Sequence, residues 1–275
     1  MNRLTTGKVL FHVILLIGVV ASIFPFYWLV VMATGTTSDI YAYPPQLIPG
    51  GHLIDNIRTV RDNVNLPSAF LNTIIVSVLT TGLTLVFASR AGFTLAKFQF
   101  PGPNILFVVL LLTMALPAQL GTVPSFVIMS SLQWVGTLQA LIVPGIAGAF
   151  GIFWMRQFAL GSIPNDLVDA GRVDGCTYWQ LYTNVALPLL RPALAFLGIF
   201  TFITSWNDYF WPLVMLVNPD VMTLQVALSQ LNGVYNTDYA AVMAGTLIST
   251  IPLIIIFILG SRHFIGNIAA GALKG

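Results

Sequence analysis

The chain has 275 residues, of which 57% are hydrophobic and only 7% are charged, and its mean hydropathy is +0.88. A soluble domain carries about 25% charged residues to keep its surface hydrated, so this composition excludes a soluble protein and indicates one surrounded by lipid. The net charge of +2 is too small to suggest nucleic acid as a partner, and the single cysteine, Cys176, excludes an internal disulfide and a multi-cysteine metal site.

Six apolar stretches are long enough to cross a bilayer, since a helix needs about 20 apolar residues to span the hydrocarbon core. In chain order they are residues 9–33, 70–89, 104–130, 138–158, 187–216 and 240–261. Pro117 in the third stretch and Pro212 in the fifth either kink a span, which neighbouring helices tolerate, or mark its end. The sequence therefore predicts an all-α membrane protein, a single domain over residues 1–275 with six transmembrane helices.

The distribution of Lys and Arg predicts the orientation of these spans. If the N-terminus is cytoplasmic, all of the 11 basic residues except Arg58 and Arg61 lie in cytoplasmic segments. Lys and Arg favour the cytoplasmic side of membrane proteins, so both termini are expected in the cytoplasm. The outer segment between the fifth and sixth spans then carries three acidic residues and no basic one: Asp208, Asp220 and Asp238.

The spans contain few ionisable residues but many neutral polar ones. An ion-coupled carrier keeps buried carboxylates or histidines along its pathway, so a proton-driven mechanism is disfavoured. The polar set comprises Asn72, Thr73, Ser77, Thr80, Thr81, Thr84, Thr113, Gln119, Thr201, Thr204 and Ser205. These side chains either join helices to one another or offer hydroxyl and amide groups to a polyol in a cavity. The sequence leaves both interpretations open.

Four aromatic residues lie together near the predicted outer membrane interface: Trp206, Tyr209, Phe210 and Trp211. An aromatic belt at the membrane surface is the ordinary explanation for such a group. Stacking on a sugar ring is the alternative, and the pattern alone does not separate the two.

The long polar segment between the fourth and fifth spans, residues 161–186, is expected in the cytoplasm as two short helices. Ser162 can cap the first helix, and Gly175 is placed to end it in a left-handed conformation. Ala170 and Gly171 are small, so another protein could approach this helix closely. The segment either docks a soluble partner or lies as an amphipathic loop at the membrane surface.

The same segment carries a spaced motif. Asp169-Ala170-Gly171 is followed after three residues by Gly175, and after nine more by Val185-Ala186-Leu187-Pro188. This pattern resembles the "EAA" loop of binding-protein-dependent ABC importer permeases, which reads Glu-Ala-Ala, three residues, Gly, nine residues, Ile-x-Leu-Pro. Two positions depart from it: Asp169 replaces Glu, and Gly171 replaces the second Ala, which weakens the helix by up to about 1 kcal/mol.

Three further segments resemble carbohydrate permeases similar to the second permease subunit of the maltose transporter: residues 39–46, 96–102 and 269–275. The resemblance thus covers nearly the whole chain and implies the fold of a type I ABC importer permease. It also implies a permease subunit of an ATP-driven importer for a sugar or sugar derivative, working by alternating access.

Other transport functions remain as alternatives. An ABC permease for another small polar solute, such as a glycerol phosphate or a polyamine, is the nearest alternative. A secondary carrier or a channel is less favoured, because neither internal repeats nor charges at the membrane midplane are evident.

The resemblance also implies the partners of the chain. Ten residues would couple it to an ATPase subunit: Asp169, Ala170, Gly171, Arg172, Asp174, Gly175, Tyr178, Trp179, Leu187 and Pro188. Two ATPase subunits would bind ATP and Mg²⁺, a second permease subunit would complete a heterodimer, and an external solute-binding protein would contact Asp208, Asp220 and Asp238. The implied location is the cytoplasmic (inner) membrane of a bacterium or archaeon, with the chain crossing the lipid several times.

No catalytic role is expected for the chain itself. A phosphate-binding P-loop is absent from the sequence, because Gly7-Lys8 is followed by Val9 rather than by Ser or Thr. No catalytic residue, metal ligand or bound cofactor is predicted, so ATP hydrolysis would reside in the partner subunits.

Overall fold

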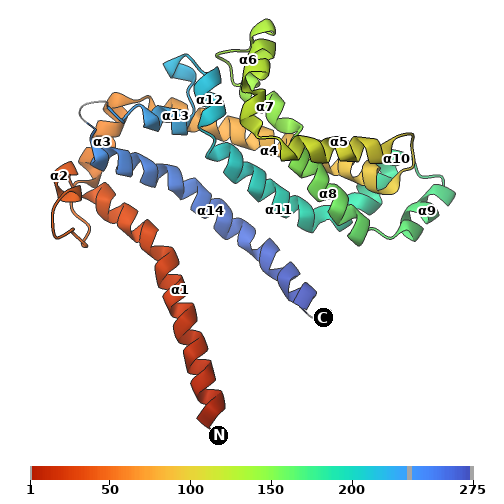
Figure 1. Ribbon diagram of the computed structural model, residues 1–275, viewed down its shortest axis with the longest axis horizontal. Helices are drawn as coiled ribbons and strands as arrows, with labels where there is room; N and C mark the ends of the chain where they lie inside the picture. The colour runs from red at the N-terminus through yellow and green to blue at the C-terminus, as the bar shows by residue number, and fades with distance from the viewer. Residues whose placement is uncertain (1, 234–236, 273–275) are drawn as a thin grey trace. The chain divides into compact units, whose positions relative to one another are not determined.

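The computed structural model describes residues 2–233 and 237–272, with side chains described only between residues 7 and 259 (Figure 1). The regular structure of the described residues is entirely helical, which confirms the all-α prediction. The tail segment 269–275, which resembles the C-terminus of carbohydrate permeases, lies beyond the residues whose side chains are described.

The chain forms two compact units. The first consists of Met1–Leu66 and Ala227–Ile251, and the second consists of Pro67–Val226 and Pro252–Gly275. The first unit contains α1 (Asn2–Thr34), α2 (Thr37–Ile40), α3 (Leu53–Asn63) and the beginning of α14 (Tyr239–Ala272). Asn56 of α3 donates from Nδ2 to the carbonyl oxygens of Ala33 and Gly35, both at 2.9 Å. Because both carbonyls are at the C-terminal end of α1, this side chain fixes α3 against it.

A capping box begins helix α2. The Thr36 hydroxyl accepts from the Asp39 backbone N–H, and the Asp39 carboxylate accepts from the Thr36 backbone N–H. Such reciprocal bonds satisfy donors that a helix N-terminus otherwise leaves free. The hydrogen bonds from Thr36 also hold the pKa of the Asp39 carboxyl below its usual value.

The second unit contains nearly all of α4 and the helices that follow it. In chain order they are α4 (Leu66–Lys97), α5 (Pro103–Ala115), η1 (Ala118–Gly121), α6 (Thr122–Ser131), α7 (Gln139–Ile146), α8 (Ala149–Ser162), α9 (Asn165–Val173), α10 (Tyr178–Gln180), η2 (Leu181–Ala186), α11 (Leu187–Trp206), α12 (Phe210–Met215) and η3 (Pro219–Val221), with α13 (Leu224–Ser229) beginning in it. Helix α8 packs against both α5 and α11.

Gly92 lies where α4 and α8 approach each other closely. A Cβ at this position would lie 2.6 Å from Cβ of Met155 and 2.7 Å from the backbone nitrogen of Arg156. Both distances are shorter than any tolerable contact, so only glycine permits this crossing. Around it, buried apolar side chains of α4, α8, α11 and the α9–η2 segment form one core.

Five stretches of the described chain are long and apolar enough to cross a membrane: Gly7–Thr34, Leu66–Lys97, Gln139–Ser162, Tyr178–Trp206 and Tyr239–Leu259. A sixth predicted stretch, residues 104–130, is not one continuous helix, because Pro103–Ala115 and Ala118–Ser131 meet at an angle of 100°. Pro117 lies at this break. Proline lacks the N–H that would continue a helix, which explains the interruption.

The fifth predicted stretch, residues 187–216, is also broken. Its helix ends at Trp206, and Pro212 lies in the separate short helix α12. Both prolines that the sequence left ambiguous therefore belong to broken stretches. That each stretch crosses a membrane, and that both termini face the cytoplasm, remain predictions.

Candidate functional sites

Helix α9 is the centre of the first candidate site. Pro164 precedes it in an extended conformation, whereas Ser162 is the last residue of α8 and donates its hydroxyl hydrogen to the Phe158 carbonyl at 2.7 Å. The prediction that Ser162 caps this helix is therefore wrong, because the hydroxyl is used within the preceding helix. At the other end, Gly175 has a φ of +78°, which confirms the predicted left-handed stop.

One face of α9 packs against its own chain, and the other is exposed. Val168 is 2% exposed, and a Cβ on Gly171 would lie 2.5 Å from Cδ2 of Leu181. Gly171 is therefore explained by packing within the chain. Ala170 is exposed, and Val173 is 88% exposed. Of the two small residues in the motif, Ala170 is the one that leaves room for another protein.

Hydrogen bonds attach α9 to the C-terminal end of α4. Arg172 donates to Oδ1 of Asp169 at 3.1 Å and to the carbonyl oxygen of Lys97 at 3.2 Å, and its guanidinium carbon lies 4.9 Å from the ring centroid of Phe98. Lys97 donates from Nζ to Oδ1 of Asn165 at 2.8 Å. The ion pair is exposed and contributes little stability, so its main effect is to set the position of α9.

Aromatic side chains fix the segment after α9 on the same helix. The Tyr182 hydroxyl lies 2.7 Å from Oγ of Ser89, and the Tyr178 hydroxyl lies 3.1 Å from Oγ1 of Thr94. Phe93 is fully buried, and its ring centroid is 6.0 Å from that of Tyr178 and 6.2 Å from that of Tyr182. The segment is therefore attached to α4 through hydrogen bonds and aromatic contacts.

The ten predicted coupling residues fall into an exposed group and a supporting group. Six exposed residues on and after α9, which we call the α9 surface, are Asp169, Ala170, Arg172, Asp174, Gly175 and Trp179. Pro188 is also exposed, in the first turn of α11, whereas Gly171, Tyr178 and Leu187 are half-buried. The sequence motif gave no signal for the α4 residues that hold this surface, because no spacing relates them to it.

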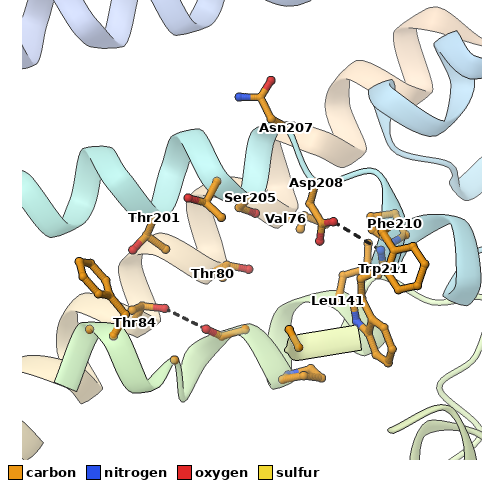
Figure 2. Close-up of a pocket in the computed structure, with 18 of the residues that line it drawn as sticks. Val76, Thr80, Thr84, Leu141, Thr201, Ser205, Asn207, Asp208, Phe210 and Trp211 are labelled. Carbon is orange, nitrogen blue, oxygen red and sulfur yellow. Dashed lines mark hydrogen bonds between the residues drawn. The ribbon is translucent and has the colours of Figure 1, made fainter. Parts of the chain in front are cut away.

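The second candidate site is a cavity of about 800 Å³ lined by α4, α7, α8, α11, α12 and the segment around η1 (Figure 2). Its polar lining residues are Thr80, Thr84, Gln119, Thr122, Ser125, Thr201, Thr204, Ser205, Asn207 and Asp208. Small-molecule sites in proteins commonly have about 300 to 1,000 Å³. We call this site the hydroxyl-lined cavity.

The neutral polar residues singled out in the sequence have two kinds of surroundings. Thr80, Thr84, Gln119, Thr201, Thr204 and Ser205 line the cavity. Thr73 instead joins segments of the chain: its Oγ1 accepts from the backbone N–H of Leu224 at 2.7 Å. Asn72 does the same by donating to the Met222 carbonyl at 3.2 Å. Helix joining is therefore shown for Asn72 and Thr73, and binding of a polyol by the residues that line the cavity stays a prediction.

The four aromatic residues also differ in their surroundings, and neither the membrane belt nor stacking on a sugar is tested. Trp206 is 1% exposed and stacks on Phe202 within the core, whereas Tyr209, Phe210 and Trp211 line the cavity. The indole N–H of Trp211 donates to the carbonyl oxygen of Ala140 at 2.9 Å. This hydrogen bond fixes the position of the ring.

The three outer acidic residues have three different environments. Asp208 lines the cavity and accepts from the Trp211 backbone N–H at 3.4 Å. Asp238 accepts from the Thr37 hydroxyl at 2.6 Å and from the Ala241 backbone N–H at 3.1 Å, so it caps α14. The Asp220 carboxylate is exposed and has no hydrogen bond or ion pair within the described residues.

Comparison with known proteins identifies the family. The model of the family described as "Binding-protein-dependent transport system inner membrane component" matches residues 88–265. The chain belongs to this family. The resemblance read from residues 169–188 is thereby confirmed, and the matched region of this transport-system component includes the α9 surface and most of the cavity.

Curated relatives lie in the same group of transport-system permeases. The arabinooligosaccharides transport system permease protein AraQ of Halalkalibacterium halodurans is 37% identical over 75% of this chain and 74% of its own. The lactose transport system permease protein LacG of Rhizobium radiobacter is 34% identical over 89% and 88%. The sn-glycerol-3-phosphate transport system permease protein UgpE of Escherichia coli O1:K1 is 30% identical over 92% and 93%.

A solved structure confirms the fold. A chain from the crystal structure of a bacterial ABC transporter involved in the import of the acidic polysaccharide alginate superimposes with a TM-score of 0.82 and 23% sequence identity. The match covers 96% of this chain and 98% of that one. The predicted fold of an ABC importer membrane component is therefore correct.

Proposed function

We propose that this chain is a permease subunit of a binding-protein-dependent importer for a sugar-like solute, driven by ATP hydrolysis in separate subunits. Relatives named as permease proteins for arabinooligosaccharides, lactose and glycerol 3-phosphate support the class and the type of solute. The role of this chain is to form part of the path through the membrane and to receive the motion of the ATPase subunits.

The α9 surface is the observation that carries this proposal. It presents the small side chain of Ala170 beside the charged side chains of Asp169 and Asp174, all exposed. A partner surface can approach closely over Ala170. Because Tyr178 and Tyr182 attach the following segment to α4, a displacement of α9 would move the long helices with it.

Transport then works by alternating access between two packings of the helices. A ligand shifts such an equilibrium only by its difference in affinity for the two states. Closure of the ATPase subunits on ATP and Mg²⁺ favours the outward-open packing, and the loaded binding protein docks to the same state. The nucleotide is bound by the partners, and this chain transmits the change.

The remaining partners follow from the same assignment. A second permease subunit completes a heterodimer, and an external solute-binding protein contacts the outer acidic residues. Asp220 fits that contact best, because its carboxylate is exposed and unengaged within the described residues, whereas Asp238 is engaged by Thr37. Both termini lie in the cytoplasm, and the chain resides in the inner membrane of a bacterium or archaeon.

Import of a glycerol phosphate is the second candidate function. It is favoured by the relative UgpE, whose match covers 92% of this chain. The composition of the cavity lining bears on the choice between a sugar and a glycerol phosphate.

Substitution of Ala170 tests the proposed coupling. Ala170→Trp adds bulk on the exposed face and should abolish co-purification of nucleotide-hydrolysing subunits and ATP-dependent uptake. Ala170→Ser keeps a small side chain at the same position and should retain both. Membrane insertion of the two variants should be equal. Normal ATP-dependent uptake by Ala170→Trp would remove the α9 surface from the mechanism.

A further inference from the structure

The charge of the hydroxyl-lined cavity is determined by one side chain. Among its lining residues, all of which lie in the described part of the chain, Asp208 is the only Asp or Glu. No Lys, Arg or His contributes to the lining. A solute in this cavity therefore meets neutral hydroxyls, aromatic rings and a single carboxylate.

The carboxylate of Asp208 has capacity for a ligand beyond its bonds within the chain. It accepts from the backbone N–H of Trp211 at 3.4 Å, and Figure 2 shows it near the entrance to α12, beside Trp211 and Phe210. An ionised carboxylate offers about four acceptor positions. Hydroxyl groups of a solute can fill the others with charge-assisted bonds, which are roughly twice as strong as neutral ones.

Thr80 supplies a second polar group on the wall. Its side chain is 6% exposed, and its Oγ1 has no hydrogen-bond partner within the described residues. Figure 2 shows Thr80 in the space between Ser205 of α11 and Leu141 of α7. Buried hydroxyls are ordinarily hydrogen-bonded, so an unpaired one needs a specific explanation. A polar solute in the adjoining cavity provides one.

Aromatic surface accompanies these polar groups. Phe210 is 47% exposed and Tyr209 is 42% exposed, although both line the cavity. Ligand sites typically combine apolar and aromatic walls with a few polar groups that fix orientation. A sugar ring presents both an apolar face and a rim of hydroxyls, and it matches this combination.

We propose that the hydroxyl-lined cavity selects a neutral sugar or polyol and rejects phosphorylated and acidic solutes, with Asp208 as the residue that determines this charge preference. The inference rests on the proposed function and narrows its substrate class. Like charges placed together without a compensating cation are strongly disfavoured, so a phosphate or uronate group has no favourable position here. The preference would separate this chain from the glycerol-3-phosphate permease that it resembles.

The test uses the complete transporter, purified through this chain and reconstituted in proteoliposomes with its binding protein. Three labelled probes are compared: lactose and arabinotriose, which are neutral, and sn-glycerol 3-phosphate, which is anionic. We expect ATP-dependent uptake of at least one neutral probe and none of the anion. Preferred uptake of sn-glycerol 3-phosphate, or uptake of neither neutral probe, would overturn the inference.

Two variants assign the preference to this cavity. Asp208→Asn keeps an oxygen that can accept from the Trp211 backbone N–H, removes the charge and replaces the other carboxylate oxygen with an NH2 group. It should raise KM for the neutral probe about 10- to 100-fold, the loss expected for a hydrogen bond to a charged group. Asp62→Asn removes an exposed acid of α3 and should leave KM unchanged. Equal KM values for the Asp208 and Asp62 variants would contradict the assignment.

The role of Thr80 has its own matched control. Thr80→Val preserves the shape of the side chain and should raise KM about fivefold through loss of one hydrogen bond. Ser77→Ala removes another buried, unpaired hydroxyl of α4 that does not line the cavity, and it should have no effect on KM. If both changes alter KM equally, helix packing rather than solute contact explains the result.

Failure of this inference is distinguishable from failure of the proposed function. If no nucleotide-hydrolysing subunit co-purifies with the chain, the proposed function is wrong. If the complex assembles, hydrolyses ATP and imports the anion, only the charge preference is wrong.

Discussion

The hydroxyl of Tyr182 lies 2.7 Å from the hydroxyl of Ser89, and both side chains are buried. This contact joins the segment after α9 to α4, 93 residues earlier in the chain. The attachment explains how a surface helix of nine residues can hold a defined position. It also makes the mechanical connection between α9 and the long helices open to measurement.

Removing that contact should weaken the attachment measurably. Tyr182→Phe deletes one hydrogen bond, and we expect the purified complex to lose about 1 kcal/mol of stability, measured by thermal unfolding in detergent. Ser89→Ala should have a similar effect. The double variant should lose less than the sum of the two single losses, because both changes remove the bond between Tyr182 and Ser89, while Ser89→Ala also removes the bond from Ser89 to the Leu85 carbonyl. Strict additivity would show that the two hydroxyls act independently.

The two small residues of the motif should respond differently to added bulk. Gly171→Leu places a side chain where Leu181 already lies, and such overpacking costs about 1 to 3 kcal/mol. Ala170→Leu adds the same bulk on the exposed face and should leave thermal stability unchanged while impairing association with the ATPase subunits. Thermal unfolding and co-purification of the two variants separate these effects. Equal destabilisation by both changes would contradict the assignment of the faces.

The crossing of α4 and α8 should depend on Gly92. Gly92→Ala introduces a Cβ 2.6 Å from Cβ of Met155, so the helices must separate, at a cost of about 1 to 3 kcal/mol. Gly82→Ala is the matched control in the same helix, because a Cβ there meets no atom within 4 Å. It should be neutral or slightly stabilising. Folded yield and thermal stability in detergent report both outcomes.

Substitutions of the outer acidic residues Asp238 and Asp220 should have different effects on stability and on binding of the solute-binding protein. Asp238→Ala removes the cap of α14 and should cost about 1 kcal/mol of stability, whereas Asp238→Asn should retain it because Asn caps as well as Asp. Asp220→Asn should leave stability unchanged but weaken association with the solute-binding protein, measured by surface-immobilised binding. If Asp238→Asn weakened binding of the solute-binding protein and Asp220→Asn did not, Asp238 rather than Asp220 would be the contact residue.

Much of the fold follows from composition and hydrophobic length. The absence of a charged surface and the run of apolar stretches determine an all-α membrane protein, and the spacing from Asp169 to Pro188 identifies the family. Local geometry is predictable where one residue decides it, as at Gly175, where the left-handed conformation favours glycine.

The parts that sequence reasoning missed depend on tertiary contacts. Ser162 has the right chemistry for an N-cap, but a competing acceptor within α8 takes its hydroxyl. Gly171 has the small size expected of a docking residue, but Leu181 packs against it and explains the glycine. The division of Thr73 and Thr80 between helix joining and cavity lining is set by which helices surround each residue, and no periodicity encodes that information.

Labelling and cross-linking of a cysteine at position 170 test most directly whether α9 faces the cytoplasm and contacts a nucleotide-hydrolysing subunit. With Cys176→Ser in the background, Ala170→Cys should be labelled by a membrane-impermeant thiol reagent only from the cytoplasmic side. It should also cross-link to a nucleotide-hydrolysing subunit in native membranes. Labelling from the external side, or a cytoplasmic thiol that cross-links to no such subunit, would contradict the proposal that this helix receives the driving motion.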